Sequence, residues 1–272
     1  MAASLNTQQT ALLTDTIAAL GTETFGHQLL QFIQACVSFD SAVMMAYPDD
    51  AKLVVVQDEL DAGDRAPFDG PYRNGLYLLS PLYVESHAGR RGCFHISDIA
   101  PDGFTESEFY NLYYSANDSI DQMAYLMETS QGTPLVLSLE RTSKLPPFNA
   151  SDRAALNDLL DIISTLVKQQ RWPDSLETVP LDMHTHLNNV MELFGSSTLT
   201  PRERDVVRLI LRGYPSKSVA RELNISTQTE QVHRKNIYHK LGISSHSELF
   251  TLFFDAIALP TTDGDPLLVL RA

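Results

Sequence analysis

The stretch LTPRERDVVRLILRGYPSKSVARELNISTQTEQVHRKNIYHKLGISSHSEL, residues 199–249, decides the fold of the C-terminal part of this chain. Thr200 and Glu203 form a capping-box pair around Pro201, so a helix begins there, and Gly213 is typical of a helix end. Helix-capping and helix-ending residues of this kind predict four helices, over 200–213, 215–223, 226–241 and 245–258. A short helix, a tight turn and a longer helix make a helix-turn-helix unit.

The third predicted helix has two faces of different chemistry. Stepping about 100° per residue places Glu230, Ile237 and Leu241 in one narrow arc, which must face the first two helices. The opposite arc carries mostly long hydrogen-bond donors and no carboxylate, as a surface for the DNA major groove requires. Its members are Gln228, Gln231, Lys235, Tyr238 and His239. Three further residues are placed to hold phosphates, namely Lys217, Thr227 and Arg234.

These residues resemble a known family. The segments LTPRERDVVRLILRG, KSVARELNIS and VHRKNIYHKLGISS are similar to the LuxR/GerE-type helix-turn-helix of bacterial transcription regulators, almost without gaps. The resemblance implies DNA binding as a homodimer, with the fourth helix as the dimer contact. It also implies that the base-contacting positions fall on Gln231, Val232 and Lys235.

Two adjacent residues depart from the family pattern. The family usually has Thr-Val-Lys where this chain has Thr229-Glu230-Gln231. A buried, unpaired carboxylate is costly, so we expect Glu230 to reach Arg234 or an arginine of the first helix. Gln231 exchanges a basic side chain for one suited to adenine. Together the two changes predict an altered sequence preference or weaker binding.

The distribution of charge divides the chain. The 272 residues carry a formal net charge of −14, with −16 on residues 1–197 and +3 on 198–258. We predict a sensor domain over 1–171, a linker and connector helix over 172–197, the DNA-binding domain over 198–258 and a tail over 259–272. We find no secretory signal or membrane span, and the two cysteines read as reduced thiols, so we expect a cytoplasmic protein.

The N-terminal part reads as an α+β domain. Short β-rich runs predict five strands, over 41–47, 52–57, 93–97, 120–128 and 134–141. Helices are expected within the first 40 residues and over 76–86, 107–114 and 149–171, with a loop over 58–74. This order predicts a five-stranded antiparallel sheet with helices against it. The arrangement resembles GAF/PAS-like or autoinducer-binding sensor domains.

A group of aromatic residues is the candidate effector site. Tyr72, Tyr77, Tyr83 and Phe94, with Phe109, Tyr110, Tyr113 and Tyr114, can line an apolar pocket whose hydroxyl groups orient a ligand. The alternative is that most of them pack the sheet. The segments 39–42 and 79–82 resemble those of autoinducer-binding domains, but Ser80 stands where such domains have Asp. Such domains also carry tryptophans in the pocket, whereas residues 1–171 contain no Trp. Acyl-homoserine-lactone binding is therefore not favoured.

Other functional classes find no support in the sequence. We find no GxSxG, HExxH, Walker or GxGxxG pattern, so we expect no enzyme, no catalytic residues and no cofactor. His184 and His186 face different sides of a predicted helix, so no metal site is expected. The spacing of Asp49-Asp50, Asp98 and Lys144 is similar to that of the acidic pair, the phosphorylated Asp and the Lys of a receiver domain. However, the predicted strand over 52–57 follows the acidic pair at once and leaves no room for the crossover helix that a parallel sheet requires.

The sequence thus predicts a dimeric transcriptional regulator that binds double-stranded DNA. Its sensor domain would respond to an effector, for which a small apolar molecule is one candidate, and would modulate promoter binding. The alternative is an interaction protein whose C-terminal module contacts the transcription machinery, with RNA polymerase as a candidate partner, and binds DNA weakly. Glu230 and Gln231 keep this alternative open.

Overall fold

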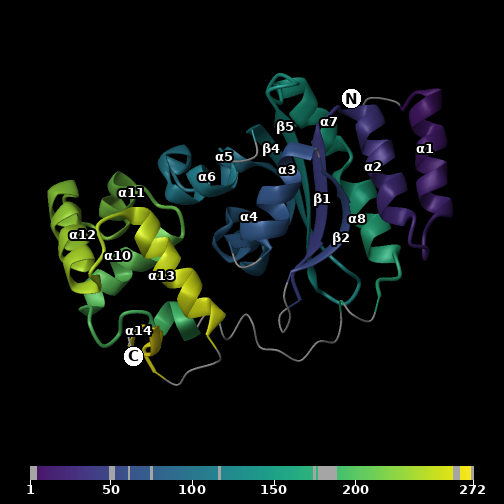
Figure 1. Ribbon diagram of the computed structural model, residues 1–272. Helices are drawn as coiled ribbons and strands as arrows, with labels where there is room; N and C mark the ends of the chain where they lie inside the picture. Colours follow the sequence, from purple (N-terminus) through teal and green to yellow (C-terminus); the bar gives the residue numbers. More distant parts are fainter. Residues whose placement is uncertain are drawn as a thin grey trace.

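The computed structural model describes residues 5–48, 53–60, 62–73, 76–115, 118–173, 176, 189–259 and 264–270. Figure 1 shows an N-terminal body built on a β-sheet and a C-terminal group of helices beside it. The predicted helix over 181–194 is helical at 189–193, and its earlier part lies outside the described residues together with His184 and His186. Asp49 and Asp50 also lie outside them.

The sheet has five antiparallel strands, as the sequence predicts. Its spatial order is β2-β1-β5-β4-β3, and every neighbouring pair is antiparallel. The strands are β1 (Ser41–Ala46), β2 (Val54–Glu59), β3 (Gly92–His95), β4 (Ser119–Glu128) and β5 (Pro134–Thr142). A receiver domain needs a parallel sheet, so this topology excludes it.

Helices cover both faces of the sheet (Figure 1). Side chains alternate along a strand, so in β1 Met44 packs with one layer of helices and Met45 with the other. The first layer contains α2 (Phe25–Cys36), α7 (Ala150–Asp158) and α8 (Leu160–Gln169), with α1 (Thr7–Ala18) packed on α2. The second contains α3 (Ala62–Pro67), α4 (Pro81–His87), α5 (Ile96–Ile99) and α6 (Glu108–Tyr113).

Two local predictions were wrong. The segment predicted as a loop over 58–74 contains α3 and a π-helical turn over Phe68–Tyr72. Phe68 and Tyr72 are buried, so tertiary packing orders a stretch whose own propensity is low. The single helix predicted over 149–171 is broken at Leu159, whose amide bonds the carbonyl of Leu156 three residues back.

The four C-terminal helices begin and end close to the residues that the sequence predicts. They are α10 (Pro201–Leu211), α11 (Ser216–Glu222), α12 (Thr227–Leu241) and α13 (His246–Ala258). A short helix, α14 (Pro266–Leu270), lies in the segment predicted as a tail and packs on α13. Val190, Met191 and Phe194, from the predicted linker, are buried in the same core.

Both cysteines are free thiols. Within the described ranges, no helix has the length and apolar character needed to cross a membrane. The same ranges hold no cluster of His, Cys, Asp and Glu side chains that could bind a metal ion.

Candidate DNA-binding surface and sensor pocket

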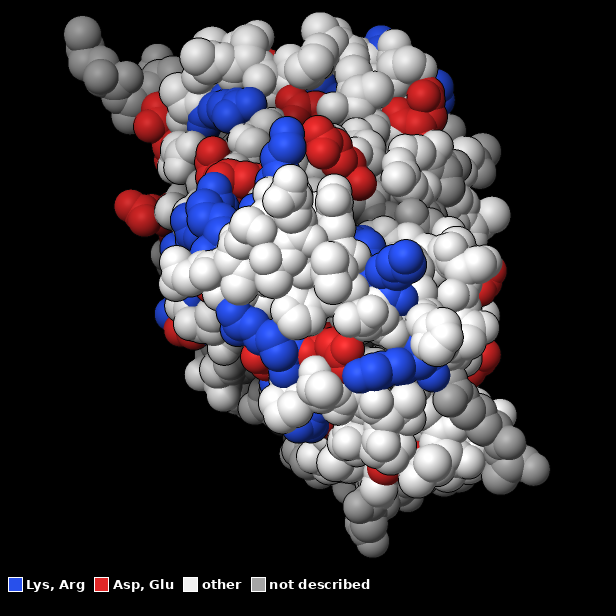
Figure 2. Space-filling view, turned by 90° about the vertical axis from the view of Figure 1, so that its left-hand side faces the viewer, with Lys and Arg blue, Asp and Glu red and all other residues white. Residues whose placement is uncertain are grey.

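Helix α12 presents a polar, accessible face. Ser226 caps it, and its hydroxyl accepts a hydrogen bond from the amide of Thr229. Ile237 and Leu241 are buried against α10 and α11, as predicted. Figure 2 views the molecule from the side that carries α12 and shows Lys and Arg around a mostly uncharged central area.

Most of the predicted DNA contacts are accessible to solvent. Gln228, Gln231, Lys235, His239, Thr227 and Lys217 are exposed, and Tyr238 is partly exposed. Val232 is 58% exposed, which is unusual for an apolar side chain that serves packing alone. A hollow runs beside the helix between Gln231, Lys235, Tyr238 and His239 and the turn at Ile243.

Arg234 differs from the other predicted contacts. Its guanidinium donates from Nε and Nη2 to Oε1 of Glu230, at 3.0 and 2.7 Å, and its side chain is 18% exposed. Glu230 is fully buried, and its second oxygen accepts a hydrogen bond from the hydroxyl of Ser216 in α11. The predicted i+4 ion pair is therefore confirmed. The Nη1 atom of Arg234 also lies 3.1 Å from Nε2 of His246, so all three guanidinium nitrogens have a partner within the domain.

A second ion pair ties α10 to α12. The Glu203 carboxylate closes the capping box with Thr200 and accepts a hydrogen bond from Lys240 Nζ at 2.6 Å. Burial would raise the pKa of Glu203, but the hydrogen bonds from Lys240 and Thr200 outweigh it, so the pKa lies below its usual value. Glu203 therefore stabilises the domain as a carboxylate.

This depressed pKa predicts an acid-dependent contribution to stability. The contribution is complete above the unfolded-state pKa of Glu203 and is lost as the pH falls through the folded-state pKa. We expect Glu203→Gln to destabilise the protein by about 1–2 kcal/mol at pH 7. In urea unfolding from pH 7 to pH 3, the gap between wild type and variant should narrow as the pH falls. A constant gap would contradict this assignment.

In the N-terminal domain, the predicted effector residues lie in the layer between the sheet and α3–α6. Tyr72, Tyr77 and Tyr83 are buried. Tyr47 joins them, stacked on Tyr77 with ring centres 5.9 Å apart and edge-on to Tyr83 at 5.2 Å. Phe94 on β3 is partly buried in the same layer, under the Arg90 guanidinium at 4.5 Å.

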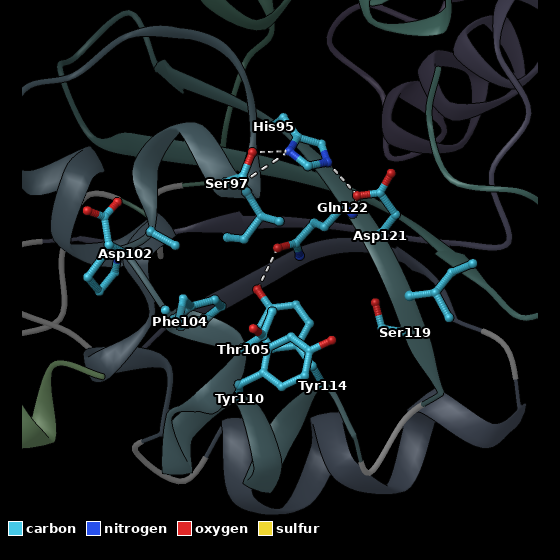
Figure 3. Close-up of a pocket in the computed structure, with 15 residues that line it drawn as sticks. His95, Ser97, Asp102, Phe104, Thr105, Tyr110, Tyr114, Ser119, Asp121 and Gln122 are labelled. Atoms are coloured by element: carbon cyan, nitrogen blue, oxygen red, sulfur yellow. Dashed lines mark hydrogen bonds and ion pairs between the residues drawn. The ribbon is translucent and has the colours of Figure 1, made fainter. Parts of the chain in front are cut away.

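A pocket of about 320 Å³ opens at the end of this layer. Figure 3 shows side chains from β3, α5, α6 and the first residues of β4 around it. Its walls combine aromatic rings and hydroxyl groups with the hydrogen-bonded side chains of His95 and Asp121. They include His95, Ser97, Phe104, Tyr110, Tyr114, Ser119, Asp121 and Gln122. Of the eight aromatic residues predicted for an effector pocket, Tyr110 and Tyr114 line it. The others, including Tyr72, Tyr77, Tyr83 and Phe94, are not among its described lining residues.

Hydrogen bonds fix one wall of this pocket. His95 Nε2 lies 2.5 Å from Asp121 Oδ1, and His95 Nδ1 lies 2.6 Å from the hydroxyl of Ser97. Burial would raise the pKa of Asp121, but the hydrogen bonds from His95 and from the Phe148 amide outweigh it and lower the pKa. His95 is also the N-cap of α5, so the Ser97 contact belongs to a helix cap. Asp121 is thus an ionised carboxylate at the pocket wall.

The loop that follows α5 contacts the helix-turn-helix. Arg221 donates to Asp102 Oδ2 at 2.6 Å, and the hydroxyl of Ser218 donates to the Asp102 carbonyl at 2.7 Å. Ser218 is buried although it lies on α11 of the other domain. The ring of Phe104 also lies close to Gly213, at the end of α10. Residues 102–104 therefore both line the pocket and hold the C-terminal helices.

The fold and surface define a two-domain protein with a helix-turn-helix DNA-binding module. Residues 197–253 match the family described as "Bacterial regulatory proteins, luxR family". The C-terminal domain is therefore a luxR-family helix-turn-helix domain, and the chain is a luxR-family transcriptional regulator with a sensor-like N-terminal domain. This family is not enzymatic, as the sequence predicts.

Relatives and a solved structure agree with this assignment. A protein named for a helix-turn-helix transcriptional regulator in the exeN 3' region of Aeromonas salmonicida is 28% identical over 170 residues, covering 59% of this chain and 86% of that protein. The nitrate/nitrite response regulator protein NarL of Escherichia coli K12 is 46% identical over 178 residues, covering 65% of this chain and 66% of that protein. The VqsR LBD domain from Pseudomonas aeruginosa superposes with a TM-score of 0.52 at 25% identity, covering 60% of this chain and 96% of that domain.

Sequence reasoning identified Tyr110 and Tyr114 as pocket candidates, but it missed the contact between the domains and the rest of this pocket. Its lining residues come from four separate segments, and no spacing pattern connects His95 with Asp121 or Phe104 with Gly213. One signal was present, because Asp121 and Gln122 are polar residues that directly precede a largely apolar run of the same strand, Met123–Met127. Polar groups at buried strand positions need partners, and these two have them in the pocket wall.

Proposed function

We propose that this protein is a dimeric, cytoplasmic transcription factor that reads DNA sequence through α12 and whose affinity for promoters depends on an effector bound by the sensor domain. The observation that carries the proposal is the exposed row of donors on α12, with Gln231 and Lys235 one turn apart. A helix of this kind enters the major groove, where bidentate contacts to base edges supply specificity.

The proposed dimer contact is α13. Its buried face holds Leu249, Phe250 and Phe253, while Leu252 and Phe254 remain partly exposed on other sides of the helix. More apolar surface than the domain itself covers supports a partner helix, and a second copy would set the spacing of two recognition helices. Sedimentation at micromolar concentration should show a dimer that Leu252→Glu weakens.

The alternative is an interaction protein that contacts RNA polymerase and binds DNA feebly. This alternative rests on Gln231, which stands at a position of the predicted major-groove surface where the family usually has a basic residue. Selection from a pool of random duplexes by the full chain separates the two functions. A regulator enriches one sequence pattern in each half-site, whereas an interaction protein enriches none.

Two substitutions should distinguish base reading from phosphate binding. Lys217→Ala should weaken binding to all duplexes alike and reduce the slope of log affinity against log salt by about one unit per monomer, because one phosphate contact is lost. Gln231→Ala should leave the slope nearly unchanged, cost about 1–3 kcal/mol on the selected site and relax the choice at one base pair per half-site.

Fluorescence anisotropy with selected and random duplexes at several salt concentrations measures both effects. Lys168→Ala is the matched control for Lys217→Ala, because Lys168 lies on α8 of the sensor domain and should not affect the slope. Equal weakening of both duplexes by Gln231→Ala would refute the base-reading role.

The effector is proposed to bind in the apolar layer between the sheet and α3–α6, where Tyr72, Tyr77, Tyr83 and Phe94 lie. A molecule that binds only the native state raises the melting temperature in proportion to its concentration and affinity. A screen of small apolar molecules against the full chain should therefore identify the effector by a thermal shift. Helix α11 touches this domain, so such binding has a direct route to the DNA-binding helices.

A further inference from the structure

The pocket at the end of the sensor layer has a wall of stacked aromatic rings. Tyr110 and Tyr114 are nearly parallel, with ring centres 5.1 Å apart. Phe104 meets both edge-on, at 5.7 and 5.6 Å. Ile96 and Ile120 add apolar surface. A flat, apolar molecule fits such a wall, because aromatic rings prefer stacked or edge-on neighbours.

The two carboxylates at the pocket already have partners: Asp102 pairs with Arg221, and Asp121 is hydrogen-bonded to His95. Asp121 is ionised in the wall, and Asp102 lies at the rim with its side chain 75% exposed. No Lys or Arg occurs among the described residues that line the pocket. An anion would meet two carboxylates there and no Lys or Arg among the described lining residues that could bind it. The pocket therefore favours a neutral molecule.

The Ser119 hydroxyl, at the pocket, has no hydrogen-bond partner in the part of the chain that the structure describes. Ser119, the first residue of β4, is 6% exposed and lines the pocket. Its hydroxyl is buried and has no hydrogen-bond partner among the described residues. Buried polar groups in proteins are nearly always satisfied, so a ligand oxygen is a fitting acceptor for this hydroxyl.

We propose that this pocket binds a small, neutral aromatic molecule with one hydrogen-bond acceptor, and that the bound molecule weakens DNA binding by holding residues 102–104 against α11. The proposal deepens the effector-dependent regulation proposed above and rests on it. The site includes Phe104 and Ser119 and is a second ligand site of the sensor domain, separate from the layer of Tyr72, Tyr77 and Tyr83 proposed above.

The coupling follows from the shared loop. A ligand that contacts Phe104 stabilises the loop as it stands in this structure, where Asp102 holds Arg221 and the Ser218 hydroxyl. In this arrangement Asp102 neutralises the charge of Arg221, and the acidic sensor domain lies beside α11, which carries Lys217. Both effects oppose the approach of a phosphate backbone. A ligand that favours this docked state must therefore reduce DNA affinity.

Calorimetry on the full chain tests the site, with 2-acetylnaphthalene as the probe and 2-naphthoate as its charged match. We expect the neutral probe to bind and the carboxylate to bind about tenfold more weakly or not at all. Ser119→Ala should weaken the neutral probe about three- to tenfold, as expected for one lost hydrogen bond. Ser164→Ala on α8 is the matched control and should leave binding unchanged. Absence of binding by the neutral probe, or an equal response to both compounds, overturns the proposed site.

Anisotropy with the selected duplex then tests the coupling. Saturating 2-acetylnaphthalene should lower the DNA affinity of the wild type several-fold. Asp102→Asn should raise the affinity without probe and remove most of the probe's effect, while calorimetry still detects the probe in the pocket. A probe that binds and leaves DNA affinity unchanged or higher overturns the coupling. A wild type that selects no duplex in the absence of probe instead refutes the proposed function, and calorimetry still decides the site.

Discussion

Replacing Arg234 by alanine is expected to destabilise the DNA-binding domain by about 3–5 kcal/mol, because it leaves the Glu230 carboxylate buried without its charge partner. Glu230 has no exposed surface, and Arg234 supplies two of its hydrogen bonds. The hydroxyl of Ser216 remains, but one neutral donor does not replace a guanidinium. Hydrogen exchange of the α12 amides in the full chain measures the loss.

The double replacement gives the decisive control. Glu230→Val alone should leave stability unchanged or raise it, because the family's usual apolar residue then fills the site and Arg234, 18% exposed, can turn toward water. Glu230→Val with Arg234→Ala should recover most of the loss caused by Arg234→Ala. If Glu230→Val itself cost several kcal/mol, the pair would be an essential part of the domain and not a tolerated departure from the family pattern.

Replacing Asp265 by alanine is expected to cost about 2–4 kcal/mol, since its carboxylate accepts several hydrogen bonds in the core of the same domain. The donors are the amides of Gly195, Ser197 and Leu267 and the hydroxyl of Ser197. Asp265 is 5% exposed, so water cannot easily replace the lost acceptor. Hydrogen exchange should show faster opening of 189–197 and of α13.

Two further variants calibrate this effect. Asp265→Asn keeps one carbonyl acceptor and should cost about half as much. Asp255→Ala removes an exposed carboxylate from α13 and should stay within about 0.5 kcal/mol of the wild type. A small effect of Asp265→Ala would mean that 264–270 is a dispensable tail. The expected large effect would extend the DNA-binding domain through α14.

The C-terminal domain could be predicted in detail because its signals are local. Capping boxes, the glycine after α10 and a 3.6-residue period act within a few residues, so they can be read without tertiary information. Even the Glu230–Arg234 pair followed from i+4 spacing on one helix. The sensor sheet was also predictable, since its β-rich runs are separated by turn residues.

Other features of the sensor domain could not be predicted in this way. The segment before Leu76 folds into helical turns because Phe68 and Tyr72 find a core provided by distant strands. Nor does local sequence show whether a tyrosine packs or binds. Tyr72 and Tyr77 pack on neighbouring rings, whereas Tyr110 and Tyr114 form the wall of an open pocket.

The sequence by itself determined the class of this protein, its four C-terminal helices and the face of α12 that is turned away from the core. These depend on short-range spacing and on the separation of a basic segment from an acidic one. Only the tertiary structure decided that Ser216 joins the Glu230–Arg234 pair, that Asp265 anchors the segment after α13, and that residues 102–104 join a sensor pocket to α11. Each of these depends on groups brought together from far along the chain, and burial sets their energy because it removes water as the competing partner.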